Sequence, residues 1–326
     1  VICGQFASYF APWAGLAMIE ATVKAVGSLV ILKFAVDIGL FVFNAFFRKG
    51  IPPSSYGKWA VVTGATDGIG KAFAFELAKK KCNVLLISRT QSKLDEVAKE
   101  ITEKHAGTEV KTLAIDFGQF TESARNQVAQ AVKGLDIGVL VNNVGMSYEF
   151  PQYFHELTDQ EVSQLQEINC SSTLWMSRIV IPIMKAKTGK NKGAIINISS
   201  GAGTCASPLL AEYSAAKGFI QRLSESMAAE YEKDGIFVQC QTPLFVTTKL
   251  SKIRKSSIVT PTPEAYAKVG VNALGGPFVF SPYFAHTIQL ALLNAVPNVV
   301  ANKLQLQMHL GLRARGMKKR DSQKKN

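Results

Sequence analysis

Short apolar runs alternate with longer amphipathic segments from Lys58 onward. The short runs carry few polar positions, which is typical of strands that helices cover on both faces of a sheet. Strands and helices that alternate in this way predict an α/β fold built as a Rossmann-like, doubly wound parallel sheet. Ligands bind such a sheet beyond the carboxyl ends of its strands, so we expect chemistry where each run ends. The predicted strands are residues 59–64, 83–88, 110–116, 137–143, 193–200 and 236–241.

Two apolar stretches precede this alternating region. Residues 1–19 carry no charge, and residues 25–47 are apolar except for Lys33 and Asp37, which are spaced to pair on one helix face. Either stretch has the length of about 20 residues that a membrane helix needs. A signal peptide fits less well, because the apolar region is too long and no convincing cleavage site follows it. We therefore expect one or more N-terminal membrane helices.

The charges near both ends of the chain complete the domain organisation. Arg48 and Lys49 follow the second apolar stretch, and the positive-inside rule places what comes after them in the cytosol. The net charge is +13, but it is concentrated at the carboxyl end and forms no basic stripe interleaved with aromatic residues, so nucleic acid is not an expected partner. We expect a membrane anchor over residues 1–50, a catalytic domain over 57–312 and a basic tail over 313–326.

The segment 276–300 is rich in apolar residues but contains three prolines. A helix that lies on a bilayer, or the lining of an apolar substrate site, explains it better than a spanning helix, and an ordinary core helix remains an alternative. Residues 251–280 carry many Ser, Thr, Pro and Gly. We expect a substrate loop there and assign no helix or strand to it.

Cysteine and histidine spacing does not predict a metal site. The five cysteines are widely spaced and include no CxxC pair, so reduced and mostly buried thiols are expected. Two N-x-S sequons begin at Asn169 and Asn197, in segments predicted as core helix and core strand. Glycosylation in a lumen would damage that core, which favours a cytosolic location for the globular part.

A glycine-rich turn, "TGATDGIG", connects the first predicted strand to a helix. Glycines let the backbone turn sharply and approach a pyrophosphate, and the amino terminus of the helix offers free N–H groups to it. The placement of the turn between strand and helix predicts dinucleotide binding. The candidate cofactor residues in this turn are Gly64, Thr66, Asp67, Gly68, Ile69 and Gly70.

The end of the second predicted strand bears on the choice of dinucleotide. An NAD site carries an acidic residue about 20 residues after the glycines, but here Ser88 and Arg89 stand at that strand end. Because an arginine can pair with a 2′-phosphate, the sequence predicts NADPH as the cofactor, with a solvated surface arginine as the alternative. Asp116 ends the third strand and is expected either to accept a bond from the adenine amine or to cap a helix.

Ser200, Tyr213 and Lys217 are the candidate catalytic residues. Tyr213 and Lys217 stand four apart, so both face the same side of a helix. A neighbouring ammonium favours the ionised form of a tyrosine, and we expect it to lower the pKa of Tyr213 toward the working pH. Ser200 ends the fifth predicted strand, where its hydroxyl and that of Tyr213 can both bind one carbonyl oxygen. That arrangement suits protonation of the oxygen while a nicotinamide hydride attacks the carbon.

With these residues the sequence resembles the short-chain dehydrogenase/reductase family. "TGATDGIG" is similar to the family's TGxxxGxG turn, and "NNVG" at 142–145 to its NNAG strand end, which adds Asn143 and Gly145 to the cofactor site. The resemblance implies that Asn169 holds a water near the lysine. Pro243 and Thr248 resemble the family's PGxxxT segment, whose threonine contacts the nicotinamide amide. Leu244 replaces the glycine of that segment.

Longer motifs resemble one subfamily, the very-long-chain 3-oxoacyl-CoA reductases, also named 17β-hydroxysteroid dehydrogenase type 12. These motifs are "TDGIGKAFAFELA", "LVNNVGMSYEFP" and "TPLFVTTKLSKIRK", together with the apolar amino terminus and the lysine-rich end. The resemblance implies an endoplasmic reticulum membrane enzyme that reduces long-chain 3-oxoacyl-CoA with NADPH in fatty acid elongation. Its catalytic domain would face the cytosol. Other fatty acid elongation enzymes are candidate partners, and so are further copies of the chain, which would form a homo-oligomer.

Two other functions stay open at this point. A ketosteroid such as estrone fits the same chemistry, and a non-catalytic NADP-binding scaffold is the alternative of another class. A run of cations after Thr248 agrees with an acyl-CoA substrate, because lysine and arginine suit the phosphates of coenzyme A. A basic rim against lipid headgroups explains the run equally well. The run consists of Lys249, Lys252, Arg254 and Lys255.

Overall fold

A computed structural model describes residues 2–43, 47–48 and 50–324 of the chain. The chain separates into two compact units, Val1–Arg48 and Lys49–Asn326. The first unit contains one helix, α1 (Ile2–Val42), and the second contains the sheet and the remaining helices.

Helix α1 is continuous through the two apolar stretches. Side chains are described for most of its carboxyl-terminal half, where apolar residues such as Leu29, Ile31 and Phe34 are exposed. Among the described residues, none of the helices has both the length and the apolarity to span a bilayer. The expected spanning helix is therefore not found in that part of the chain. The expected pairing of Lys33 with Asp37 involves a side chain, that of Asp37, outside the described ones.

The second unit is built on a parallel sheet whose strand order is β3-β2-β1-β4-β5-β6-β7. All neighbouring strands pair in parallel, as the apolar runs predicted. The chain reverses its winding direction between β1 and β4, so the carboxyl ends of these two strands open beside each other. The strands are β1 (Trp59–Thr63), β2 (Asn83–Ser88), β3 (Val110–Ala114), β4 (Ile137–Asn142), β5 (Gly193–Ile198), β6 (Ile236–Gln241) and β7 (Val279–Phe280).

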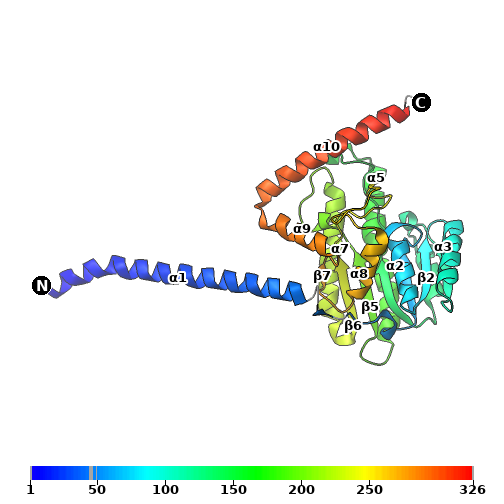
Figure 1. The fold of residues 1–326 in the computed structure, drawn as a ribbon, viewed down its shortest axis with the longest axis horizontal. Helices are drawn as coiled ribbons and strands as arrows, with labels where there is room; N and C mark the ends of the chain where they lie inside the picture. Colours follow the sequence, from blue (N-terminus) through cyan, green and yellow to red (C-terminus); the bar gives the residue numbers. More distant parts are fainter. Residues whose placement is uncertain (1, 44–46, 49, 325–326) are drawn as a thin grey trace. The chain divides into compact units, whose positions relative to one another are not determined.

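The sheet has a helical layer and an apolar core on each face (Figure 1). Successive residues of β1 point to opposite faces, so Ala60 and Val62 pack in one core while Val61 packs in the other. The six predicted strands are confirmed within two residues at their ends. The helices of this unit are α2 (Gly68–Lys79), α3 (Gln91–Lys104), α4 (Glu122–Val132), α5 (Asp159–Gln166), α6 (Ser172–Lys185), α7 (Ala211–Tyr231), α8 (Pro263–Asn272), α9 (Phe284–Ala295) and α10 (Asn298–Lys324).

The carboxyl-terminal quarter contains elements that the sequence pattern did not predict. Helix α8 lies inside the expected loop 251–280, where Thr262 caps its amino terminus by accepting a bond from Ala265 N, and Pro263 fits the first turn. The two residues of β7 pair with Cys240 and Gln241, but a strand of this length has no alternating pattern to recognise. The residues expected as a basic tail, 313–326, belong to α10 as far as Lys324.

We expect Leu86→Ala to destabilise the second unit by about 2–5 kcal/mol, because Leu86 is fully buried in β2 and its truncation leaves a cavity. Urea-induced unfolding of the full chain measures this. Leu174→Ala, at an exposed leucine of α6, is the control and should change the free energy of unfolding by less than about 0.5 kcal/mol. Equal effects of the two changes would contradict the assignment of Leu86 to the core.

Candidate active site

A cavity of about 860 Å³ opens at the carboxyl ends of β1, β4, β5 and β6. It brings together most of the residues proposed from the sequence, although they are spread over almost 190 positions of the chain. Those that border it are Gly64, Thr66, Asp67, Gly68, Ile69, Asn143, Gly145, Ser200, Tyr213, Lys217, Pro243 and Thr248. Those that do not border it are Gly70, Ser88, Arg89, Asp116 and Asn169.

The glycine-rich turn is shaped by close backbone contacts. Gly64 and Gly68 have φ angles of +64° and +53°, which favour glycine. A Cβ on Gly70 would stand 2.3 Å from Gly64 O and 2.3 Å from Asn143 Nδ2, so Gly70 packs behind the cavity rather than bordering it. Asn143 Nδ2 donates to Thr63 O at 3.0 Å and thereby joins β4 to the turn. Thr63 Oγ1 accepts from Asn143 N at 3.0 Å, a contact that no motif had indicated.

Helix α2 presents its amino terminus at the same edge. Asp67 caps it by accepting a bond from Gly68 N at 2.8 Å. Thr248 lies against the turn, because its Cγ2 is 3.1 Å from where a Cβ on Gly68 would stand. Lys249 closes the contact with an ion pair to Asp67 at 2.8 Å. The amino terminus of α2 therefore lies at the edge of the cavity, flanked by the segment that follows β6.

Ser200, Tyr213 and Lys217 border the cavity at its centre. Ser200 lies two residues past β5 and accepts a bond from Ala202 N at 3.2 Å, which fixes its hydroxyl at the start of a short 3-10 turn. Tyr213 and Lys217 lie in the first two turns of α7. Lys217 Nζ donates to Ile198 O at 3.2 Å and stands 5.8 Å from the ring centroid of Tyr213.

Burial controls the protonation of both α7 residues. It lowers the pKa of Lys217 to about 8, because no carboxylate contacts this ammonium among the described residues. Burial also raises the pKa of Tyr213, and hydrogen bonding to Ser200 lowers it only in part. The expectation that the ammonium brings down the tyrosine pKa is wrong for the protein by itself, since desolvation outweighs the neighbouring charge.

Asn169 lies in a π-helical turn (Glu167–Ser171) between α5 and α6. Its Nδ2 donates to Met146 O at 3.0 Å and to Leu165 O at 2.9 Å, and its Oδ1 accepts from Met146 N at 3.2 Å. A Cβ on Gly145 would stand 3.0 Å from Asn169 Oδ1 and 3.2 Å from Lys217 Nζ, so glycine keeps these two polar groups close. Asn169 therefore binds both backbone groups of Met146 and holds the loop after β4 beside Lys217.

The residues at the ends of β2 and β3 lie outside the cavity. Ser88 Oγ is 2.9 Å from Thr66 Oγ1, so it supports the glycine-rich turn. Arg89 is exposed, and no ion-pair partner is found for it among the described residues. Asp116 Oδ1 accepts from Gly118 N at 2.9 Å and caps a 3-10 turn, which is the helix-cap alternative raised from the sequence.

The family model for short chain dehydrogenase matches residues 58–257, which span the glycine-rich turn, the catalytic candidates and Thr248. The chain belongs to the short-chain dehydrogenase family. The resemblance seen in the sequence motifs is therefore confirmed. It also accounts for the convergence of Ser200, Tyr213 and Lys217 on one cavity.

Two curated relatives cover this short-chain dehydrogenase almost completely. A protein of Homo sapiens named very-long-chain 3-oxoacyl-CoA reductase is 40% identical over 90% of this chain and 94% of its own. A protein of Anas platyrhynchos with the same name is 43% identical over 92% of this chain and 97% of its own.

Solved structures share the fold of the second unit. A 7β-hydroxysteroid dehydrogenase is 25% identical and superposes with a TM-score of 0.69 over 78% of this chain and 99% of its own. The L-sorbose reductase of Gluconobacter frateurii, solved with NADPH and L-sorbose, is 26% identical with a TM-score of 0.59, over 72% of this chain and 95% of its own.

The segment after β6 has an unforeseen support, the buried side chain of His286. Its Nδ1 accepts a bond from Leu244 N at 3.3 Å, and its Nε2 lies 3.2 Å from Phe245 O. Burial lowers the pKa of His286, which keeps the ring neutral and able to accept. His286 thus fixes the backbone where Leu244 replaces the family's glycine, and an isolated histidine in an apolar segment gave no sign of this.

The far half of the cavity is apolar and extends to α9 and α10. Leu292, Leu293 and Val296 of segment 276–300 border the cavity, as expected for the lining of an apolar site. Two other residues of the same helix, His286 and Leu290, are buried, as expected for a core helix. Polar groups interrupt the lining at Gln305 and His309, and His309 Nδ1 lies 2.6 Å from Pro208 O. The lining residues in this half are Cys205, Ser207, Leu210, Gln289, Leu292, Leu293, Val296, Leu304, Gln305, Met308 and His309.

The cations after Thr248 differ in how they are engaged. Lys249 pairs with Asp67, and Lys252 donates to the backbone carbonyl of Glu149. Arg254 and Lys255 are exposed, and no ion-pair partner is found for either among the described residues. Arg254 and Lys255 are therefore the two cations of this run that remain available to an anionic ligand.

We expect Lys217→Met to abolish turnover and yet to stabilise the protein at pH 7, on the order of 3 kcal/mol. The folded pKa near 8 is lower than the ordinary value of 10.5, so below pH 8 the folded state bears the full cost of a buried ammonium. Between pH 8 and 10.5 Lys217 is neutral in the folded state and charged in the unfolded state. The free energy of unfolding of the wild type therefore rises with pH, and its difference from that of the variant disappears. Urea unfolding from pH 7 to 10.5 measures this. Lys233→Met, at an exposed lysine, is the control. A difference in free energy of unfolding between wild type and Lys217→Met that does not change with pH would contradict the lowered pKa of Lys217.

Proposed function

We propose that the chain reduces long-chain 3-oxoacyl-CoA to 3-hydroxyacyl-CoA with NADPH, as a step of fatty acid elongation. The observation that carries the proposal is one cavity that is bordered by the glycine-rich turn, by Ser200 and Tyr213, and by apolar residues of α9 and α10. The names and near-complete coverage of the curated relatives support the same activity.

The residues of the turn fit NADPH. A side chain at Gly64 or Gly68 would fill space beside Val144 or Thr248, so the missing Cβ atoms leave a cradle at the amino terminus of α2. Arg89 follows β2 without an ion-pair partner among the described residues, which suits the extra phosphate that distinguishes NADPH from NADH.

The side chains at the centre of the cavity suit acid catalysis of a carbonyl reduction. Bound NADPH supplies a hydride to the carbonyl carbon. Ser200 donates a hydrogen bond that orients the 3-oxo oxygen, and Tyr213 gives that oxygen its proton. Because burial raises the pKa of Tyr213, the hydroxyl is protonated at neutral pH and ready to act as an acid. The positive charge of Lys217, whose Nζ lies 5.8 Å from the ring centroid of Tyr213, then stabilises the tyrosinate.

Location at the endoplasmic reticulum membrane, with the second unit in the cytosol, is part of the proposal. Exposed apolar side chains along α1 support membrane association of the first unit. Two sequons whose asparagines are buried support a cytosolic second unit, since Asn169 and Asn197 could not carry glycans in this fold. Partnership with other elongation enzymes follows from the proposed reaction.

NADPH oxidation by the full chain in detergent, with 3-oxohexadecanoyl-CoA as substrate, tests the activity. Tyr213→Phe should lower kcat by about 10²–10⁴-fold, because it removes the proton donor and little else. Estrone and NADH are run in parallel. Turnover of estrone alone would transfer the function to steroid reduction, and full activity of the variant would exclude Tyr213 as the acid.

We expect Arg89→Gln to raise KM for NADPH about tenfold to a hundredfold, through loss of a charge-assisted hydrogen bond, and to leave KM for NADH unchanged. Steady-state kinetics with both cofactors measure this. Lys233→Gln is the control for a general loss of surface charge. Equal changes in both KM values would show that Arg89 does not recognise the 2′-phosphate.

A further inference from the structure

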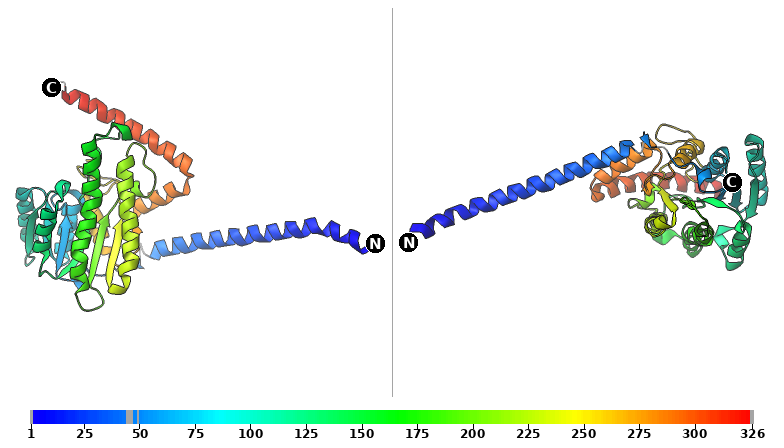
Figure 2. Two further views of the ribbon diagram at one scale, coloured as in Figure 1. Left: turned by 180° about the vertical axis from the view of Figure 1, so that it is seen from behind. Right: turned by 90° about the horizontal axis from the view of Figure 1, so that it is seen from below.

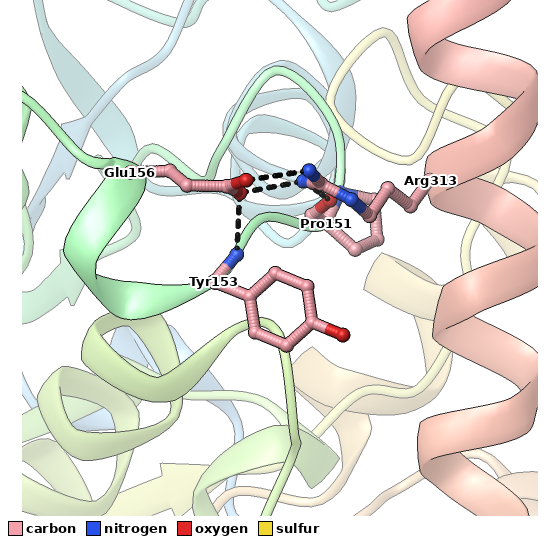
Figure 3. A network of polar contacts seen from close by, with 4 residues as sticks. All are labelled: Pro151, Tyr153, Glu156 and Arg313. Carbon is pink, nitrogen blue, oxygen red and sulfur yellow. Dashed lines mark hydrogen bonds and ion pairs between the residues drawn. The ribbon is translucent and has the colours of Figure 1, made fainter.

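Helices α9 and α10 form a hairpin whose turn, near Val296 and Pro297, projects away from the sheet (Figures 1 and 2). The second half of α10 is fixed to the rest of the unit. Arg313 makes a bidentate ion pair with Glu156, at 2.6 and 2.7 Å, and also donates to Pro151 O at 3.3 Å (Figure 3). His309 adds its bond to Pro208 O. The hairpin is therefore attached to the rest of the second unit by these hydrogen bonds and this ion pair.

Three apolar residues of this hairpin, Leu292, Leu304 and Met308, border the cavity. Solvent reaches 64%, 61% and 45% of their surfaces, a fraction that includes the part facing the cavity. The apolar lining contributed by α9 and α10 is therefore open to solvent and is not covered by further packing. A long acyl chain that fills the cavity has an apolar exit at this point.

Apolar side chains are exposed at the hairpin turn as well. Val299 is 68% exposed and Val300 is 47% exposed, and neither borders the cavity. Exposed apolar side chains that lie together mark a surface that binds a protein or a membrane. We call the exposed apolar residues of the hairpin the hairpin surface: Leu292, Val299, Val300, Leu304 and Met308.

The charges of the same part of the chain have one sign. Between Asp234 and Asp321 the sequence contains a single acidic residue, Glu264. Cations occur throughout this stretch: Lys249, Lys252, Arg254, Lys255, Lys268, Lys303, Arg313, Arg315, Lys318, Lys319 and Arg320. A part of the chain that combines exposed apolar residues with an excess of cations complements the headgroups and acyl chains of an anionic bilayer, even though Lys249 and Arg313 are already paired with Asp67 and Glu156. A second copy of the chain complements it poorly, because a two-fold contact would bring the same cations together.

We propose that the hairpin surface docks on an anionic phospholipid bilayer, and that the acyl chain of the substrate passes between Leu292, Leu304 and Met308 from the cavity into the lipid. The acyl route rests on the proposed function, while the docking surface does not. A bilayer would cover the exposed apolar side chains and receive a chain that is too long for the cavity, with the coenzyme A phosphates left in water near Arg254 and Lys255.

Photocrosslinking of the full chain in lipid nanodiscs tests the docking surface. Benzoylphenylalanine replaces Val299 in one protein and, as controls, Leu174 or Lys99 in others; Leu174 is an exposed leucine on α6, and Lys99 is exposed on α3. In nanodiscs that contain phosphatidylserine, lipid adducts at position 299 should exceed those at either control by about tenfold. Equal yields at the three positions, or crosslinks from position 299 to a second copy of the chain, would overturn the proposal.

The choice of an anionic lipid is tested with the probe at position 299 and a second change at Val300, which does not border the cavity. Val300→Glu and Val300→Lys remove the same apolar group and differ in charge. With phosphatidylserine the glutamate variant should give about fivefold less adduct than the lysine variant, and with phosphatidylcholine alone the two should agree. Equal yields in both lipids would remove the electrostatic part of the proposal.

The acyl route is tested by kinetics in the same nanodiscs. Leu304→Gln should raise KM for 3-oxohexadecanoyl-CoA about tenfold and leave KM for acetoacetyl-CoA unchanged, because only the long chain reaches the hairpin. Leu174→Gln is the matched control. Equal changes for both substrates would contradict the route. If the wild type oxidises NADPH with neither acyl-CoA, the proposed function and the route both fail, and the crosslinks still decide the docking surface.

Discussion

The parallel pairing of β1 with β4 is the constraint on which the rest of the site depends. It sets the carboxyl ends of two strands side by side at the point where the winding reverses, and Asn143 ties them together through its bond to Thr63 O. That bond leaves no room for a side chain at Gly70 and so selects the shape of the turn before α2. The turn after β1 and the loop after β4, which both border the cavity, are held together at this pair of strand ends.

The candidate catalytic residues of α7 are buried at a cost in stability. Lys217 has a backbone carbonyl of β5 as its hydrogen-bond partner, and burial of its charge lowers its pKa to about 8. Burial acts on Tyr213 in the opposite direction and keeps its proton in place. The two shifts act in opposite directions and place the pKa of Lys217 below that of Tyr213. A better solvated site would be more stable and less suited to acid catalysis.

Helix α10 gives the substrate half of the cavity its character. Its second half is clamped to the loop after β4 by Arg313 and Glu156, and its first half presents apolar side chains both to the cavity and to the outside. Gly316 allows the close crossing, because a Cβ there would stand 2.4 Å from Phe150 Cβ. The second half of α10 is thus held by an ion pair, and its first half contributes Leu304 and Met308 to the apolar lining of the cavity.

The strands, the glycine-rich turn and the candidate trio could be predicted from the amino-acid sequence, because each depends on local spacing: runs of apolar residues, glycines between strand and helix, and Tyr213 one helical turn before Lys217. The other features of the site depend on contacts between distant segments, which no local pattern encodes. The bonds of His286 to Leu244 and Phe245, the pairing of Lys249 with Asp67 and the bonds of the Asn169 amide to Met146 each join different segments of the chain. The direction of the Tyr213 pKa also belongs to the tertiary structure, because desolvation depends on everything packed around the hydroxyl and no pattern of neighbours along the chain records it.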